Sequence, residues 1–174
     1  MYQKILIALQ GKGADEAVLA HVQALAAQTK AEVTLLWVIT VADDGGAGLG
    51  RQFQLEPGAS GWRHKNQAQA YLPQVARRLR EAGLSVETAL VIGARSEADE
   101  IVSYAAENGH DLIAMASDSR PWYKRWIGGS PVEGVQRKAT LPTLFVSDGT
   151  RQAPVKRTAP EENTAMAVLG SASL

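Results

Sequence analysis

The sequence contains no cysteine, which excludes disulfide bonds, thiol catalysis and thiolate metal sites. It also lacks an excess of either charge, because 18 lysine and arginine residues balance 18 aspartate and glutamate residues. Net charge therefore gives no reason to expect a nucleic acid or a membrane surface as partner. No apolar run approaches the roughly 18 residues of a spanning helix, and the N-terminus lacks the features of a signal peptide. We expect a soluble, cytoplasmic protein that binds neither nucleic acid nor membrane.

Signature motifs of several enzyme classes are missing as well. A dinucleotide-binding fingerprint opening at Gly11 would require glycine where Glu16 stands. Lys12 has neither the preceding spacer nor the following hydroxyl residue of a P-loop. A nucleophile elbow around Ser130 would require glycine where Val132 stands. We therefore predict no catalytic residue, and an activity no greater than slow ATP hydrolysis.

The titratable side chains show no arrangement typical of a metal or acid–base site. His21, His64 and His110 lack ligand spacing, so each is interpreted as a surface or core histidine. Asp99 and Glu133 each stand three residues after a serine at a predicted helix start. Capping alone explains both carboxylates. No metal is expected.

Short apolar runs alternate with amphipathic segments along most of the chain. This alternation predicts an α/β fold, a doubly wound parallel sheet with helices on both faces. The expected strands are Lys4–Leu9, Glu32–Ile39, Ser85–Ile92, Leu112–Met115 and Pro142–Ser147. The expected helices are Ala14–Thr29, Trp62–Ala82, a helix from the Ser96 cap to Glu107, and Pro131–Lys138.

Three segments fall outside this alternation. Residues 150–174 are rich in Ala, Pro, Thr and Ser and are interpreted as a flexible tail after a domain of residues 1–149. The glycine-rich connection Thr40–Gly61 is long for a compact domain, so it is either mobile or a functional flap. The basic, aromatic loop Arg120–Trp126 is either a partner-binding surface or a loop that packs on its own domain.

The stretch Asp111–Ser130 joins an apolar strand to a helix start through small residues. Ser130 is the expected N-cap, Pro131 the first helical residue and Glu133 the partner in a capping box. Free backbone N–H groups and the helix dipole at such a start favour an anion. The alternative is that Ser130 only caps the helix and that the loop is only a connection.

Five segments in order, ILIAL, LLWVI, VIG, DLIAMAS and GGSPVEGVQRKATLPTLFV, resemble the universal stress protein (UspA-like) family. The resemblance covers about residues 2–148. It implies the adenine-nucleotide α-hydrolase-like (HUP) class of fold, with a five-stranded sheet in the order 3-2-1-4-5. It also implies a homodimer through the strand Pro142–Val146 and a nucleotide pocket at the switch point between strands 1 and 4. The candidate pocket residues are Ala8, Gln10, Gly11, Val38, Met115, Ala116, Ser117, Ser119, Gly129, Ser130 and Pro131.

Members of that family that bind ATP carry Gly-x2-Gly-x9-Gly-Ser/Thr after the fourth strand. Here Gly129 and Ser130 keep the end of the motif, but Ala116 and Ser119 replace its two leading glycines, and Gln10 replaces the family's aspartate. Glycine allows the backbone to approach a phosphate closely, and a carboxylate binds a ribose hydroxyl more strongly than an amide does.

We therefore expect a non-enzymatic stress-response or regulatory module whose nucleotide site is weakened or lost. Two alternatives stay open. The first is a functional ATP- or AMP-binding universal stress protein, with Mg²⁺ as a companion ion. The second is a protein-interaction subunit that meets its partner through the loop Trp122–Trp126.

Overall fold

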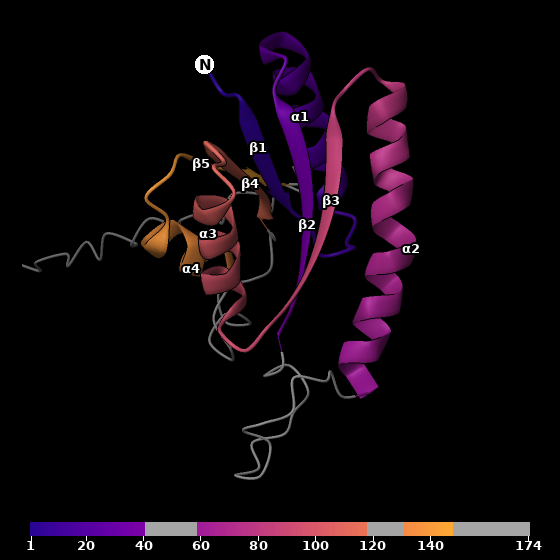
Figure 1. Ribbon diagram of the computed structural model, residues 1–174, viewed down its shortest axis with the longest axis vertical. Coiled ribbons are helices and arrows are strands. Elements are labelled where there is room, and N and C mark those ends of the chain that lie inside the picture. Colours follow the sequence, from indigo (N-terminus) through magenta and orange to yellow (C-terminus); the bar gives the residue numbers. More distant parts are fainter. Residues whose placement is uncertain (41–58, 118–130, 148–174) are drawn as a thin grey trace, which may run out of the picture.

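A computed structural model of the chain describes residues 1–40, 59–117 and 131–147, which form one α/β unit (Figure 1). Strands and helices alternate along these residues, as the sequence predicts. The elements are β1 (Lys4–Ala8), α1 (Asp15–Thr29), β2 (Glu32–Thr40), α2 (Ala59–Glu81), β3 (Val86–Gly93), α3 (Glu97–Glu107), β4 (Leu112–Ser117), α4 (Pro131–Lys138) and β5 (Thr143–Ser147).

The five strands form one parallel sheet in the order β3-β2-β1-β4-β5, which confirms the expected fold. β1 lies at the centre, where Leu6 is opposite Thr34 of β2 and Ile113 of β4. Ile5, Leu6 and Ile7 have no exposed surface. A strand with neighbours on both edges and helices on both faces must be apolar along its length, and the run KILIA meets that requirement.

Helices cover both faces of the sheet (Figure 1). α1 and α2 enclose the larger hydrophobic cluster, which includes Val18 of α1, Leu79 of α2 and Leu35 from the sheet. α3 and α4 enclose the smaller one, in which Ile101 and Val135 meet strand residues. Because α1 follows β1 on one face and α4 follows β4 on the other, these two neighbouring strands form the topological switch point.

The predicted start of α3 and the glycines predicted to end α2 and α3 are confirmed. Ser96 caps α3, because its Oγ accepts the backbone N–H of Asp99 at 3.2 Å. Gly83 and Gly109 follow α2 and α3 with positive φ angles of 87° and 67°, as helix-ending glycines do. α2 starts at Ala59, three residues before the expected Trp62, so part of the expected connection is helical.

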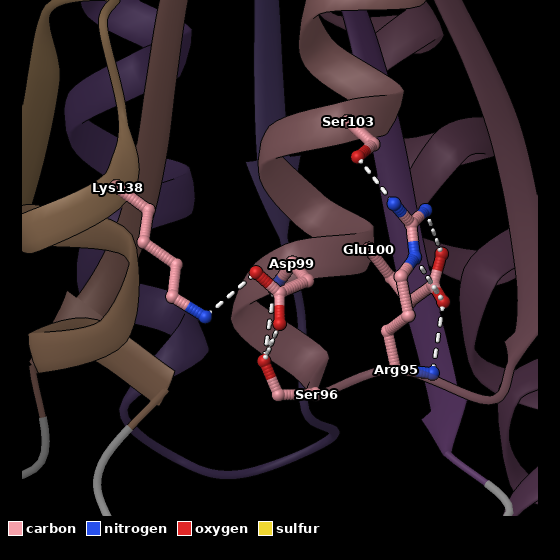
Figure 2. Close-up of polar contacts among 6 residues, drawn as sticks. All are labelled: Arg95, Ser96, Asp99, Glu100, Ser103 and Lys138. Atoms are coloured by element: carbon pink, nitrogen blue, oxygen red, sulfur yellow. Dashed lines mark hydrogen bonds and ion pairs between the residues drawn. The ribbon is translucent and has the colours of Figure 1, made fainter.

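The interpretation of Asp99 as a capping residue alone is wrong. Its Oδ1 also accepts a hydrogen bond from Lys138 Nζ at 2.6 Å, which ties the start of α3 to the end of α4 (Figure 2). The Lys138 ammonium, followed by the Ser96 hydroxyl, lowers the pKa of the Asp99 carboxyl. The sequence could not reveal this ion pair, since its two residues are 39 positions apart.

Several predictions fall on residues outside the described part of the chain. These are the mobility of the connection between β2 and α2, the role of the Arg120–Trp126 loop, the Ser130 cap, and the flexible tail from residue 150. Among the described residues, none of the helices combines the length and the apolarity needed to span a bilayer.

His110 is a core histidine, one of the two readings that the sequence left open, and this placement makes stability depend on pH. Its side chain is 3% exposed, and its Nε2 lies 3.0 Å from the Thr34 hydroxyl. Burial, supported by the nearby Lys4 charge, lowers the pKa of His110. Below about pH 6.5, the ordinary histidine pKa, the unfolded chain therefore binds more protons than the folded chain does.

We predict that the free energy of unfolding falls between pH 7.5 and pH 5.5, and that a part of this fall disappears in a His110→Gln variant. Urea denaturation at several pH values measures both. His21→Gln, at an exposed position of α1, controls for the substitution itself. Equal pH dependence in wild type and His110→Gln would contradict the prediction.

Candidate functional site

A cavity of about 400 Å³ lies at the carboxyl end of the central strands. Its walls come from the ends of β1 and β2, the turn between β1 and α1, the helix α2 and the first residues of α3 and α4. Open parallel sheets bind ligands at this place, where the connections from neighbouring strands separate. The lining residues are Leu9, Gln10, Gly11, Lys12, Trp37, Val38, His64, Gln67, Glu97 and Pro131.

A buried carboxylate fixes the turn after β1. Asp15 is 1% exposed, and its Oδ2 accepts the backbone N–H groups of Gln10, Gly11 and Lys12 at 3.1, 2.7 and 3.2 Å. Burial raises the pKa of Asp15, whereas the three N–H groups and the Lys12 charge act against that rise. These N–H groups are directed at the protein's own carboxylate. The turn is therefore a rigid support for side chains rather than a cradle for a phosphate.

Gly11 allows this turn to lie against the aromatic wall of the cavity. Its φ angle is 67°, and a Cβ at this position would lie 2.5 Å from Trp37 Cη2 and 2.6 Å from Gln67 Nε2. The Trp37 ring is 4% exposed and meets the Tyr71 ring edge-on at a centroid distance of 6.0 Å. Only glycine fits a left-handed turn that touches an immobilised indole.

Three polar side chains form a hydrogen-bonded chain at the cavity. Lys12 Nζ donates to Gln10 Oε1 at 2.7 Å, and Gln10 Nε2 donates to Glu97 Oε1 at 3.2 Å. The two charged neighbours fix the orientation of the Gln10 amide, because a cation selects its oxygen and a carboxylate selects its nitrogen. This chain connects the β1–α1 turn with the start of α3.

Ion pairs hold the start of α3 against the end of α4 and against the loop after β3 (Figure 2). Besides the contact between Asp99 and Lys138, Arg95 Nη2 lies 2.8 Å from Glu100 Oε2, and Arg95 Nη1 donates to Ser103 Oγ at 3.0 Å. Arg95 lowers the pKa of Glu100. These contacts fix the helix that carries Glu97.

The structure places four of the expected site residues in the cavity wall, namely Gln10, Gly11, Val38 and Pro131. Ala8 and Met115 lie in the core beneath α3 and α4 instead, because their side chains face that layer. Ala116 and Ser117 end β4, half-buried, and are not among the cavity-lining residues. Ser119, Gly129 and Ser130 lie outside the described residues.

Sequence reasoning missed six lining residues, and only some of them left a signal. The positions of Leu9 and Lys12 beside Gln10 could have indicated their roles, and so could that of Trp37 beside Val38. The sequence indicated only that Glu97 is an acidic residue in the first turn of a helix. The α2 residues that line the cavity, His64 and Gln67, come from a helix whose position over the strand ends no local pattern reveals.

The cavity wall combines an apolar part with a polar part of balanced charge. Leu9, Trp37 and Val38 are apolar, while Lys12 and Glu97 contribute one charge of each sign. Such a surface suits a ligand with a flat apolar ring and a hydrogen-bonding, modestly charged remainder. Within residues 1–40, 59–117 and 131–147, no group of three His, Asp or Glu side chains could hold a metal ion.

A doubly wound α/β sheet with a cavity at the switch point places this domain in the class of nucleotide-binding-like α/β folds. Comparison with known proteins gives the family directly. The model of the universal stress protein family matches residues 1–147, and the chain belongs to that family.

Individual relatives agree with this assignment. The chain is 29% identical over 156 residues to universal stress protein MJ0577 of Methanocaldococcus jannaschii, covering 84% of this chain and 95% of the relative. The solved structure of MJ0577 superposes with a TM-score of 0.69, at 27% identity, over 87% of this chain and 99% of that one.

Two solved complexes share the fold. A universal stress protein in complex with cAMP matches with a TM-score of 0.61, at 21% identity, over 84% of this chain and 97% of that one. An Archaeoglobus fulgidus universal stress protein in complex with dAMP matches with a TM-score of 0.59, at 20% identity, over 83% of this chain and 98% of that one.

The contact between Gly11 and Trp37 generates a stability prediction. We expect Gly11→Ala to lower the free energy of unfolding by about 2 kcal/mol or more, because the new methyl group meets the indole and the backbone is left-handed. Gly13→Ala is the matched control in the same turn, since a Cβ there has no neighbour within 4 Å. Urea denaturation distinguishes the two variants, and equal losses would show that the Trp37 wall can move aside.

Proposed function

We propose that this universal stress protein is a non-enzymatic regulatory module, a homodimer whose switch-point cavity binds an adenine nucleotide weakly. The cavity itself is the observation that supports the proposal, since an indole and two aliphatic side chains adjoin a polar chain of fixed geometry. Relatives with the same fold have been solved in complex with cAMP and dAMP. The polar side chains bond to one another rather than forming a nucleophile with its base, so a binding role suits them better than catalysis.

The charge of the described wall favours a monophosphate over a triphosphate. Lys12 and Glu97 cancel, and the Asp15 carboxylate already accepts the N–H groups of the β1–α1 turn. Extra phosphate groups therefore gain no net positive partner within this wall. Ala116 and Ser119, in place of the family's two glycines, oppose a close backbone approach to phosphate.

Equilibrium dialysis with AMP and ATP at millimolar concentrations, with and without Mg²⁺, tests the nucleotide site. We expect AMP to bind at least as tightly as ATP, and the purified protein to retain no ATP. Restoring Gln10→Asp, Ala116→Gly and Ser119→Gly together should tighten ATP binding. A sub-micromolar dissociation constant for ATP would favour the alternative of a functional ATP-binding protein. No measurable binding of either nucleotide would refute the proposed site.

The homodimer proposal is supported by the difference between the two sheet edges. β3 carries an exposed glutamate, Glu87, on one edge. β5, on the other edge, carries no charged residue, and its apolar side chains Leu144 and Phe145 are only partly buried. Leu144 packs against the α1 and α2 side and Phe145 against the opposite side, as alternation along a strand requires. Unprotected edges of this kind tend to pair, and two copies of β5 would form a closed two-fold dimer.

We predict that the full chain sediments as a dimer at equilibrium and that Phe145→Arg weakens this dimer. Thr88→Arg, at an exposed position on the β3 edge, controls for the added charge. Circular dichroism shows whether Phe145→Arg is still folded. A monomeric full chain that dimerises only after truncation at residue 149 would contradict the proposal and indicate that the tail covers β5.

A further inference from the structure

The order of the strands arranges the cavity wall in a line across the carboxyl ends of the strands. Trp37 and Val38 come from β2, Leu9 and Gln10 follow β1 in the middle, and Pro131 begins the helix after β4 on the other side. The wall is therefore apolar at one end and carries a helix start at the other. A ligand that lies along this line therefore contacts an apolar end, a polar middle at β1 and a helix start, in that order.

An elongated adenine nucleotide fits this line in one direction. The base suits the indole and aliphatic end, and the phosphate suits the end where α4 begins and the helix dipole is positive. The sugar then lies over the middle of the wall, at β1. This assignment rests on the proposed nucleotide function, and it does not depend on which nucleotide is bound.

Glu97 contributes a carboxylate to that middle position. It is joined to Gln10 by the 3.2 Å hydrogen bond, so it shares the location of the residue that follows the central strand. α3 is the less favourable helix start for a phosphate, because its first turn contains Glu97, Asp99 and Glu100. The first turn of α4 contains one acid, Glu133. Phosphate oxygens would be repelled at α3, whereas hydroxyl groups donate well to a carboxylate.

We propose that Glu97 determines specificity for ribonucleotides, by accepting hydrogen bonds from the sugar hydroxyl groups of the bound nucleotide. A carboxylate has about four lone-pair positions, so it can accept hydroxyl groups in addition to the contacts that it already makes, the bond from the Gln10 amide among them. Lys12 and Gln10 hold the arrangement, since Lys12 fixes the Gln10 amide whose N–H group orients Glu97. The ligand class is thus an adenine nucleotide with its 2′ and 3′ hydroxyl groups intact.

Equilibrium dialysis of AMP against 2′,3′-dideoxy-AMP, which lacks both hydroxyl groups, tests this role. Wild-type protein should prefer AMP about tenfold, the effect of losing a hydrogen bond to a charged acceptor. Glu97→Ala should bring the ratio of the two dissociation constants close to one by weakening AMP alone. Glu97→Gln, which preserves the size of the side chain, should at least halve the ratio.

Glu107→Ala is the matched control, because it removes the same charge from the exposed last residue of the same helix. Both ligands are measured on one protein, so a loss of folded fraction cancels from the ratio. AMP binding with an unchanged ratio in Glu97→Ala would overturn the role of Glu97 and leave the proposed function intact. Equal weakening of both ligands would place the carboxylate at another part of the nucleotide and overturn it too. Absence of AMP binding to the wild type would overturn the proposed function and this inference together.

Discussion

The central position of β1 is the constraint on which the rest of the structure depends. β1 pairs with β2 on one edge and with β4 on the other, and helices cover both its faces. Its backbone groups therefore bond to the two neighbouring strands, and its side chains are buried under helices on both faces. Only an apolar run of the right length can occupy such a position. The chain leaves β1 toward α1 on one face, while the neighbouring β4 leads to α4 on the other. The cavity exists because these two connections separate.

The cavity is bordered by a part of the chain that has little freedom to move. Asp15 holds three N–H groups of the β1–α1 turn, and Gly11 lies directly against the buried Trp37 ring. Tyr71 supports that ring from α2, and burial with the nearby Asp15 charge raises its pKa to about 12, so the phenol stays neutral. A rigid wall of this kind binds without reorganising, which suits recognition. The protein's own carboxylate occupies the turn where a phosphate could otherwise bind.

The ion pairs of α3 and α4 show how a structural contact contributes to a site. Asp99 and Lys138 join the two helices, and Arg95 joins the loop after β3 to Glu100. Gly93 permits the second contact, because a Cβ there would collide with the Glu100 carboxylate. The exposed ion pairs add little stability individually. Their effect on the site is positional, since they fix the helix start from which Glu97 reaches the cavity.

The alternation of strands and helices was predictable from the sequence because its signals are local, whereas the order of the strands was implied by the resemblance to the family. Apolar runs such as the one around Leu6, the Ser96 cap and the glycines that end α2 and α3 each record a backbone requirement of their own segment. Element boundaries leave weaker local signals. The first turn of α2 has little apolar pattern, so the sequence did not indicate that this helix begins three residues before Trp62.

The sequence by itself determined the alternation of strands and helices, the turn after β1, and the presence of Gln10 and Gly11 at the end of the central strand. Only the tertiary structure decided which distant side chains join them. Glu97 lies 87 positions from Gln10 in the sequence. Gln67 comes from α2, which follows the long glycine-rich connection after β2. Helical and strand periodicity reports which face of an element is buried, but not which residue of another element it meets. That choice follows from the order of the strands and the faces taken by the helices, which are properties of the whole chain.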